Sequence, residues 1–271
     1  MSRAALPVDA KPKPISGALI RFLVTVLVVL AFHNAWATLD EDWLRALGKR
    51  DVAGIERLLG RGINVNLSTK DGKTALMLAA QRGRTDVILA LLEAGAVVDQ
   101  RNTRGGTALM YAAVLGDQQT VDLLLSRGAA INLQSSNGWT ALMIAAVKGY
   151  QALVRALLNH GADANLADIY GWTPLMRAVS ENRLGVVRIL LESKAANVNA
   201  RNDTGATALH EAAEKGYFDI AQLLIVNHAD VQSADRKGRT PLLVARASGH
   251  DDIVDLINRT VAERQGSRHP R

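Results

Sequence analysis

Thr140-Ala141-Leu142-Met143-Ile144-Ala145-Ala146 is one copy of a pattern that recurs along the 271-residue chain. Six copies begin with a threonine, and the intervals between these threonines are 33, 33, 33, 34 and 33 residues. The threonines are Thr74, Thr107, Thr140, Thr173, Thr207 and Thr240. A period this regular predicts a solenoid of stacked units, which presents a long ribbed surface and has no closed active-site core.

Each copy predicts a pair of short helices. The threonine hydroxyl can accept hydrogen bonds from the first helical turn, and the next residue is alanine or proline, both acceptable at the first helical position. Nine residues after each threonine stands a residue type that tolerates the left-handed conformation at a helix end. These residues are Gly83, Gly116, Gly149, Asn182, Gly216 and Gly249. A second apolar stretch follows, for example residues 87–92, and its broad stripe needs neighbouring units to be buried.

The pattern resembles the ankyrin repeat. Residues 207–213, Thr-Ala-Leu-His-Glu-Ala-Ala, nearly match the T-P-L-H-x-A signature of that family, which has a 33-residue period. The resemblance implies an all-α repeat solenoid in which each unit has two helices and a β-hairpin loop. It also implies a protein-binding module, because ankyrin repeats elsewhere bind proteins.

The register predicts seven units. Counting back 33 residues from Leu91-Leu92 reaches Leu58-Leu59, so residues 38–68 are expected to form a degenerate N-terminal capping repeat. Residues 69–259 are expected to form six further units, the last a C-terminal cap with one apolar and one polar face. Residues 260–271 are predicted to be a basic disordered tail.

The first 37 residues read as a signal peptide. Basic residues precede the apolar run 22–32, and Ala35-Trp36-Ala37 follows it. As a helix the run would rise about 16 Å, roughly half the hydrocarbon thickness of a bilayer. We expect cleavage after Ala37 and export to the periplasm, as in an exported bacterial ankyrin protein. An uncleaved inner-membrane anchor and a different translation start remain open.

Charge and composition argue against other classes of function. The formal net charge is +6, but the leader and residues 259–271 each hold four basic residues against one acidic residue, so the repeat body is near neutral. We therefore predict no nucleic-acid binding. The chain has no cysteine, no zinc-protease motif and no phosphate-binding glycine loop, which predicts no catalytic, cofactor or metal site. We interpret Met77, Met110, Met143 and Met176 as core and not as a metal or redox ladder.

Positions that vary between repeats indicate where a partner binds. In ankyrin proteins the hairpin tip before the threonine and the end of the first helix line the concave face. These positions are apolar in the middle of this chain and charged at its ends, as expected for an interaction hot spot with a charged rim. The alternative is that each tryptophan lies flat over its own hairpin. The predicted partner-binding residues are Trp139, Tyr170, Trp172, Ile169, Val114, Leu115, Arg104 and Lys148.

One junction breaks the pattern. At the 34-residue interval Lys194 replaces the glycine found at the helix exits of other units, and one residue is inserted before Val198. His228 replaces the same glycine in the next unit. We expect less regular loops at these glycine-free exits, and the softest junction of the stack.

The leading hypothesis is a monomeric, non-enzymatic scaffold in the periplasm or cell envelope. It binds a partner protein through the concave face, needs no cofactor, and meets the membrane only transiently, through its signal peptide. One alternative is an inhibitor or immunity-type protein that blocks a toxin or hydrolase in the same compartment. Another is a membrane-tethered organiser with an uncleaved N-terminal anchor.

Overall fold

The computed structural model describes residues 40–46, 49, 51–59 and 61–266. The predicted signal peptide, residues 1–37, lies outside the described residues. Within the described part of the chain, none of the helices has the length and apolar character needed to span a bilayer.

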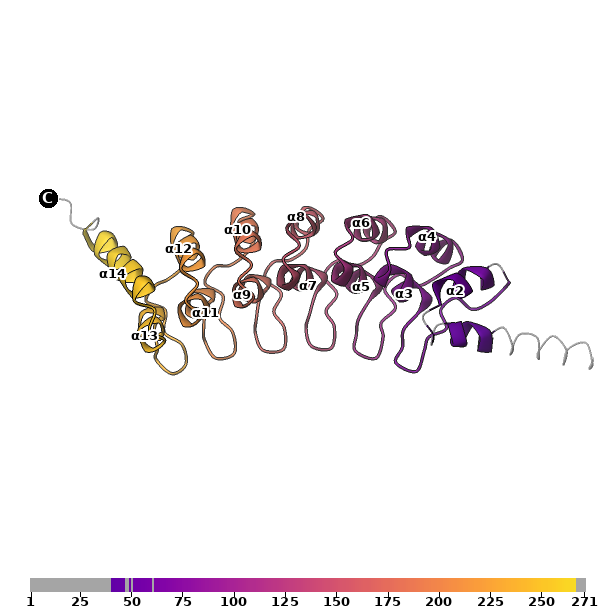
Figure 1. Cartoon of the computed structure of the whole chain (residues 1–271), viewed down its shortest axis with the longest axis horizontal. Coiled ribbons are helices and arrows are strands. Elements are labelled where there is room, and N and C mark those ends of the chain that lie inside the picture. The colour runs from indigo at the N-terminus through magenta and orange to yellow at the C-terminus, as the bar shows by residue number, and fades with distance from the viewer. Residues whose placement is uncertain (1–39, 47–48, 50, 60, 267–271) are drawn as a thin grey trace, which may run out of the picture.

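Helices arranged in two rows build the molecule (Figure 1). After a helical segment at residues 40–46 and α2 (Val52–Leu58), each unit contributes one inner and one outer helix. The inner helices are α3 (Ala75–Gln81), α5 (Ala108–Leu115), α7 (Ala141–Lys148), α9 (Pro174–Ser180), α11 (Ala208–Lys215) and α13 (Pro241–Ala247). The outer helices are α4 (Thr85–Glu93), α6 (Gln118–Ser126), α8 (Gln151–Asn159), α10 (Leu184–Glu192), α12 (Phe218–Val226) and α14 (Asp251–Gly266). The stack arches, and the loops that precede the inner helices lie on the inside of the curve (Figure 1).

The predicted helix starts and ends are confirmed. The hydroxyls of Thr74, Thr107, Thr140, Thr173 and Thr240 each accept a hydrogen bond from the backbone N–H three residues later. At the helix ends, Gly116, Gly149 and Gly216 have φ values of 81°, 79° and 72°. Asn182, the exception to glycine, also takes the left-handed conformation. Local sequence therefore sets the length of each inner helix.

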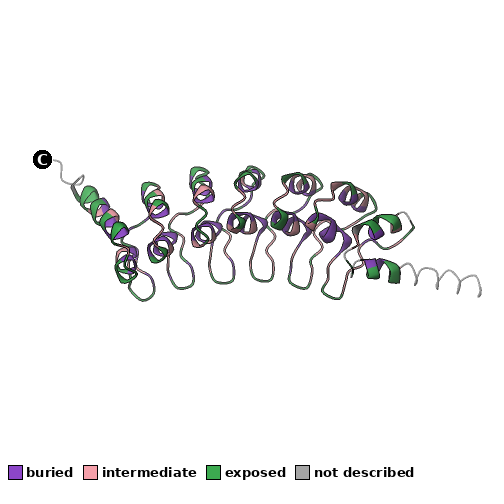
Figure 2. Cartoon of the chain, in the orientation of Figure 1, coloured by how far each residue is buried: buried purple, intermediate pink, exposed green. Residues whose placement is uncertain are grey.

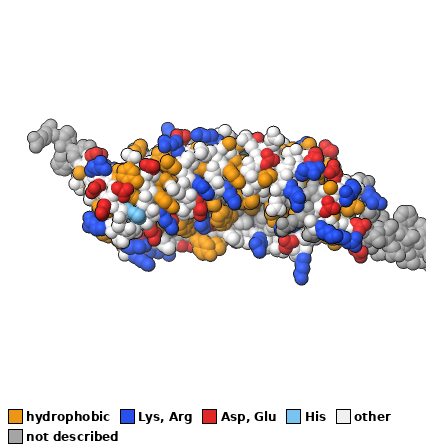
Figure 3. Space-filling view, viewed as in Figure 1, with side chains coloured by type: hydrophobic (Ala, Val, Ile, Leu, Met, Phe, Trp, Pro, Cys, Tyr) orange, Lys and Arg blue, Asp and Glu red, His pale blue; other side chains and the backbone are white. Residues whose placement is uncertain are grey.

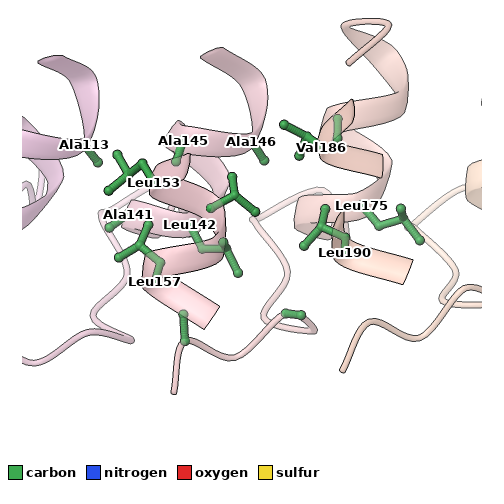
Figure 4. Packing of buried hydrophobic residues seen from close by; sticks show 14 of the residues in the cluster. Ala113, Ala141, Leu142, Ala145, Ala146, Leu153, Leu157, Leu175, Val186 and Leu190 are labelled. Carbon is green, nitrogen blue, oxygen red and sulfur yellow. The ribbon is translucent and has the colours of Figure 1, made fainter. Parts of the chain in front are cut away.

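A single apolar cluster runs through the stack from Trp43 to Ile257. Small alanines of the inner helices let the outer helices approach closely, and leucines fill the space between them (Figure 4). Burial is greatest where neighbouring helices face each other, and the loop tips stay largely exposed (Figure 2). The methionine ladder belongs to this interior, since its four side chains are at most 5% exposed, which confirms that prediction.

Neighbouring loops contact each other through backbone hydrogen bonds. The described residues contain no extended strands, and an isolated antiparallel bridge pairs Ser68 with Thr74. Each loop is a tight turn; in one, the Asp168 N–H donates to the Trp172 carbonyl at 3.0 Å. Neighbouring loops are also joined, because the Ile169 N–H donates to the Asn137 carbonyl at 3.1 Å. Glycine at position 138 allows this approach, since a Cβ there would lie 2.6 Å from the Asp168 Cα. The backbone thus fixes the row of loop tips.

The glycine-free helix exits are more regular than expected. Lys194 and His228 take φ values of 56° and 67°, in the left-handed region that glycine occupies at the other exits. Asparagines of the preceding unit hold both exits: the Asn165 side chain donates to the Ala195 carbonyl at 2.7 Å, and Asn199 donates to the His228 carbonyl at 3.2 Å. The prediction of an irregular loop is therefore wrong at His228, whereas the inserted residue after Lys194 adds a local bend.

The predicted disordered tail begins too early. Helix α14 continues to Gly266, so residues 260–266 are helical. Thr260 is buried, its hydroxyl donates to the Leu256 carbonyl at 2.8 Å, and Val261 packs against the core. Apolar contacts thus extend the last helix past the predicted boundary, while residues 267–271 lie outside the described part of the chain.

Candidate protein-binding surface

The concave face consists of the loop tips and the exposed sides of the inner helices. On the side of the molecule shown in Figure 3, hydrophobic side chains are prominent over the middle of the stack and many charged side chains lie toward its ends.

Apart from the two tryptophans, the predicted binding residues lie either at the loop tips or at the far ends of the inner helices. Ile169 and Tyr170 lie together on one loop tip and are 56% and 61% exposed. Val114 and Leu115, 42% and 43% exposed, lie at the far end of α5 from the loops. An eight-residue helix rises about 12 Å, so this apolar pair is set back from the tips. Arg104 is exposed at a loop tip, and Lys148 is exposed at the far end of α7.

Trp139 and Trp172 are half-buried and joined through an arginine that the sequence analysis did not single out. The Arg177 guanidinium carbon lies 5.1 Å from the centroid of the Trp139 ring and 4.9 Å from that of Trp172. These distances fit cation–π contacts with both rings. The two indoles therefore meet across neighbouring units through Arg177, an arrangement that neither sequence-based alternative described.

A buried carboxylate holds Arg177 in place. The Asp168 side chain is fully buried, and its Oδ2 accepts from the Arg177 Nε at 2.8 Å and also from the Arg177 Nη2. Its Oδ1 accepts from the backbone N–H of Tyr170 at 2.9 Å and of Trp172 at 3.1 Å. One side chain thus shapes the exposed tip and anchors the stacked cation.

A spacing of nine residues carries the signal that could have identified Arg177. Asn102 and Tyr111 stand at the same two repeat positions as Asp168 and Arg177. The Asn102 amide donates to the Tyr111 Oη at 2.9 Å. In these two units the fourth residue after the threonine therefore faces the loop, a position outside the tips and helix ends from which the binding residues were predicted.

The sixth unit has neither the tryptophan nor the arginine that the fifth unit has at these positions. Ala206 stands where the preceding units have tryptophan, and Glu211 stands where α9 has Arg177. A hollow of about 470 Å³ opens beside Trp172 and is lined by loop residues 202–206 and 235–239 and by Glu211 and Glu214 of α11. Burial raises the pKa of Glu211, and the nearby Lys215 opposes that rise.

His210, which also lines this hollow, connects the sixth and seventh units. Its Nδ1 accepts from the Thr207 backbone N–H at 3.1 Å, and its Nε2 lies 2.9 Å from the Arg239 carbonyl. This pair of partners requires a neutral ring with the proton on Nε2. Burial lowers the pKa of His210, which favours the same neutral form. Among the described residues, no three His, Asp or Glu side chains come together as a metal site would require.

Known proteins resemble this chain along most of its length. The family model described as "Ankyrin repeats (3 copies)" matches residues 44–135, 115–202 and 194–262. The crystal structure of the ankyrin repeat domain of Bcl-3, described as a unique member of the IkappaB protein family, aligns with a TM-score of 0.69 and 30% identity. That alignment covers 79% of this chain and 97% of the Bcl-3 chain.

A shorter match joins the chain to a curated protein. It is 36% identical over 74 residues to the mitochondrial disaggregase of Bos taurus, which is 27% of this chain but 11% of that protein. The shared segment is a small part of that protein, so the activity in its name is not carried over to this chain. The repeated threonine caps, the two helix rows and the family match agree, and the chain belongs to the ankyrin repeat family, whose repeats are in general non-enzymatic protein-binding modules.

Proposed function

We propose that this chain binds a partner protein through its concave face, as a monomeric scaffold exported to the periplasm. The exposed pair Ile169 and Tyr170 carries the proposal. Each side chain leaves more than half of its surface in solvent, although both stand at the middle of a stack whose other large apolar groups are mostly buried. An exposed tyrosine beside an exposed aliphatic residue is typical of interface centres, where the ring buries a large area and the hydroxyl keeps a polar contact.

The tip that presents this pair is already rigid. The Ile169 N–H donates to the Asn137 carbonyl at 3.1 Å, and the Tyr170 carbonyl accepts from the Asp203 N–H at 3.1 Å. Asp168 fixes the turn from inside. A partner therefore meets a tip whose backbone is ordered before binding, which reduces the entropy lost on association.

Site-specific photo-crosslinking in the native cell tests the proposal. A photoreactive amino acid at position 170 should capture a defined partner, whereas the same group at Arg188, exposed on α10 of the outer row, should not. Replacing Ile169 and Tyr170 together by alanine should abolish partner binding and change the free energy of unfolding by less than about 0.5 kcal/mol. Equal capture from positions 170 and 188, or none from position 170, would contradict the proposal.

The location is tested separately. N-terminal sequencing of the protein from a periplasmic extract should find Thr38 as the first residue. A chain recovered from the membrane with residues 1–37 attached would favour the tethered alternative.

A further inference from the structure

One arginine of the chain shows how side chains of the concave face can bind a cation. Arg177 lies against Trp139 and Trp172 and is neutralised by a carboxylate on the same surface. A guanidinium is planar and weakly hydrated, so it can stack on an indole while its N–H groups bond to a carboxylate. The arrangement needs one aromatic surface and one acidic group at a fixed spacing.

The hollow beside Trp172 offers the same two elements, and Arg177 is not among the residues that line it. Trp172 lines this hollow, so part of the indole surface remains available. Ala206 leaves space where a second tryptophan would stand. Glu211 supplies the carboxylate from α11. The volume of about 470 Å³ lies within the range of ligand pockets, roughly 300 to 1,000 Å³.

The hollow is lined by charges of both signs, and its half-buried carboxylate without an ion pair within 4.0 Å among the described residues is Glu211. The Asp235 carboxylate is already neutralised, since it accepts from the Arg239 Nε at 2.8 Å and its side chain is 2% exposed. No ion pair within 4.0 Å is found for the other lining carboxylates among the described residues; these are Asp203, Glu211 and Glu214. Glu211 is half-buried, so a cation that reaches it is only partly screened by solvent.

The cations on the opposite wall do not cancel this charge. Arg236 and Lys237 are exposed on the loop of the seventh unit, where long flexible side chains can turn toward solvent. Lys215, one helical turn after Glu211, and Arg177, on α9, both oppose the rise in its pKa, but among the described residues neither forms an ion pair with Glu211 within 4.0 Å. Glu211 is therefore the half-buried carboxylate of the hollow that has no ion-pair partner within 4.0 Å among the described residues, while the exposed edge carries charges of both signs.

We propose that this hollow binds the guanidinium of an arginine side chain of the partner protein, stacked on Trp172 and paired with Glu211. The inference rests on the proposed function, because it assigns the partner chemistry of the same concave face. It adds a second anchor beside the exposed tip, with specificity for arginine over lysine because a guanidinium stacks and forms two parallel hydrogen bonds.

A peptide titration of the full-length chain tests the proposal. The probe is the blocked tripeptide acetyl-Gly-Arg-Gly-amide, and its control contains citrulline, which has nearly the same shape and no charge. Binding is followed by the indole N–H signal of Trp172 in NMR spectra, since the chain has four tryptophans to resolve. The arginine peptide should give a saturable shift, and the citrulline peptide should bind at least about tenfold more weakly.

Two variants locate the site. Glu211→Gln should raise the dissociation constant of the arginine peptide at least about tenfold. Glu181→Gln removes the same charge from the exposed end of α9 and should change that constant less than about twofold. Equal binding of the two peptides, no saturable shift, or unchanged affinity in Glu211→Gln would overturn the proposal. If a variant fails to fold, the difference in affinity between the arginine and citrulline peptides for the unaltered chain still tests the proposal.

The two proposals can fail independently. Partner capture from position 170 without arginine binding would overturn only the arginine site. Arginine binding without partner capture from position 170 would instead contradict the proposed function, because the hollow would then exist without an interface at the tip.

Discussion

Replacing Arg177 by methionine should destabilise the middle of the stack. The loss of unfolding free energy would measure the penalty of leaving the buried Asp168 carboxylate without its cation. Methionine retains much of the apolar stem but removes the charge that neutralises Asp168. The Asp168 side chain is fully buried, and its Oδ2 would lose both guanidinium N–H groups. Breaking a buried ion pair on one side typically costs about 3 to 5 kcal/mol.

The structure places the expected loss near the lower end of that range, at about 3 kcal/mol. The Oδ1 of Asp168 would keep its two backbone donors, and water can enter from the Arg177 side, which is 20% exposed. Asp168→Asn in the same chain should recover at least about 1.5 kcal/mol, because it removes the stranded charge. Asparagine already serves this loop position: the Asn202 Oδ1 accepts from the Thr204 and Ala206 N–H groups at 2.9 and 3.0 Å.

The measurement is urea unfolding followed by both tryptophan fluorescence and far-ultraviolet circular dichroism. The two signals must coincide, since repeat arrays can unfold in parts and then lack a single free energy of unfolding. Arg188→Met is the matched control, because this arginine is exposed on α10, and its loss should change stability by less than about 0.5 kcal/mol.

Two results would refute the reasoning about Arg177. A loss below about 1 kcal/mol would mean that solvent or another group compensates Asp168 without the guanidinium. Strictly additive effects of Arg177→Met and Asp168→Asn would mean that the two side chains do not stabilise each other, despite their contact.

Two further predictions concern the sixth unit and its junctions. Because burial lowers the pKa of His210 below its usual 6.5, the unfolded chain binds a proton first, and stability should fall as pH drops from about 6.5 toward the folded pKa. The variant His210→Met, with the residue found at the same position in four other units, should flatten that slope in thermal unfolding measured between about pH 7 and 5; an unchanged slope would exclude His210 as its source. His228→Gly should raise the free energy of unfolding by about 1 kcal/mol, because φ at this position is 67° and glycine takes it without strain; equal or lower stability in urea would show that the histidine side chain compensates.

The sequence was sufficient for the features that repeat. Threonine caps, left-handed helix ends and the buried methionines follow from local propensity and a fixed period, and each is confirmed. The prediction failed where contacts between units override a local rule. Asn199 holds the exit at His228 in a regular turn, and burial of Thr260 and Val261 prolongs α14.

The candidate binding surface likewise has features that the sequence predicts and features that depend on the tertiary structure. Exposure of Ile169 and Tyr170 follows from their place at a loop tip, which the period reveals. Asp168 and Arg177 lie nine residues apart in one unit, so their pairing depends on how the loop folds against the first helix. The contact of Arg177 with tryptophans of two units depends on how far one unit is rotated and shifted against the next.

By itself the sequence determined the fold, the number of units and the row of loop tips on the concave face, because a repeated local pattern fixes repeated local structure. Only the tertiary structure decided that Arg177 fills the space between Trp139 and Trp172 while the space beside Glu211 stays open. The physical reason is that the contact of Arg177 with Trp139 and the open space beside Glu211 are set by distances between units, and a sequence records those distances only indirectly.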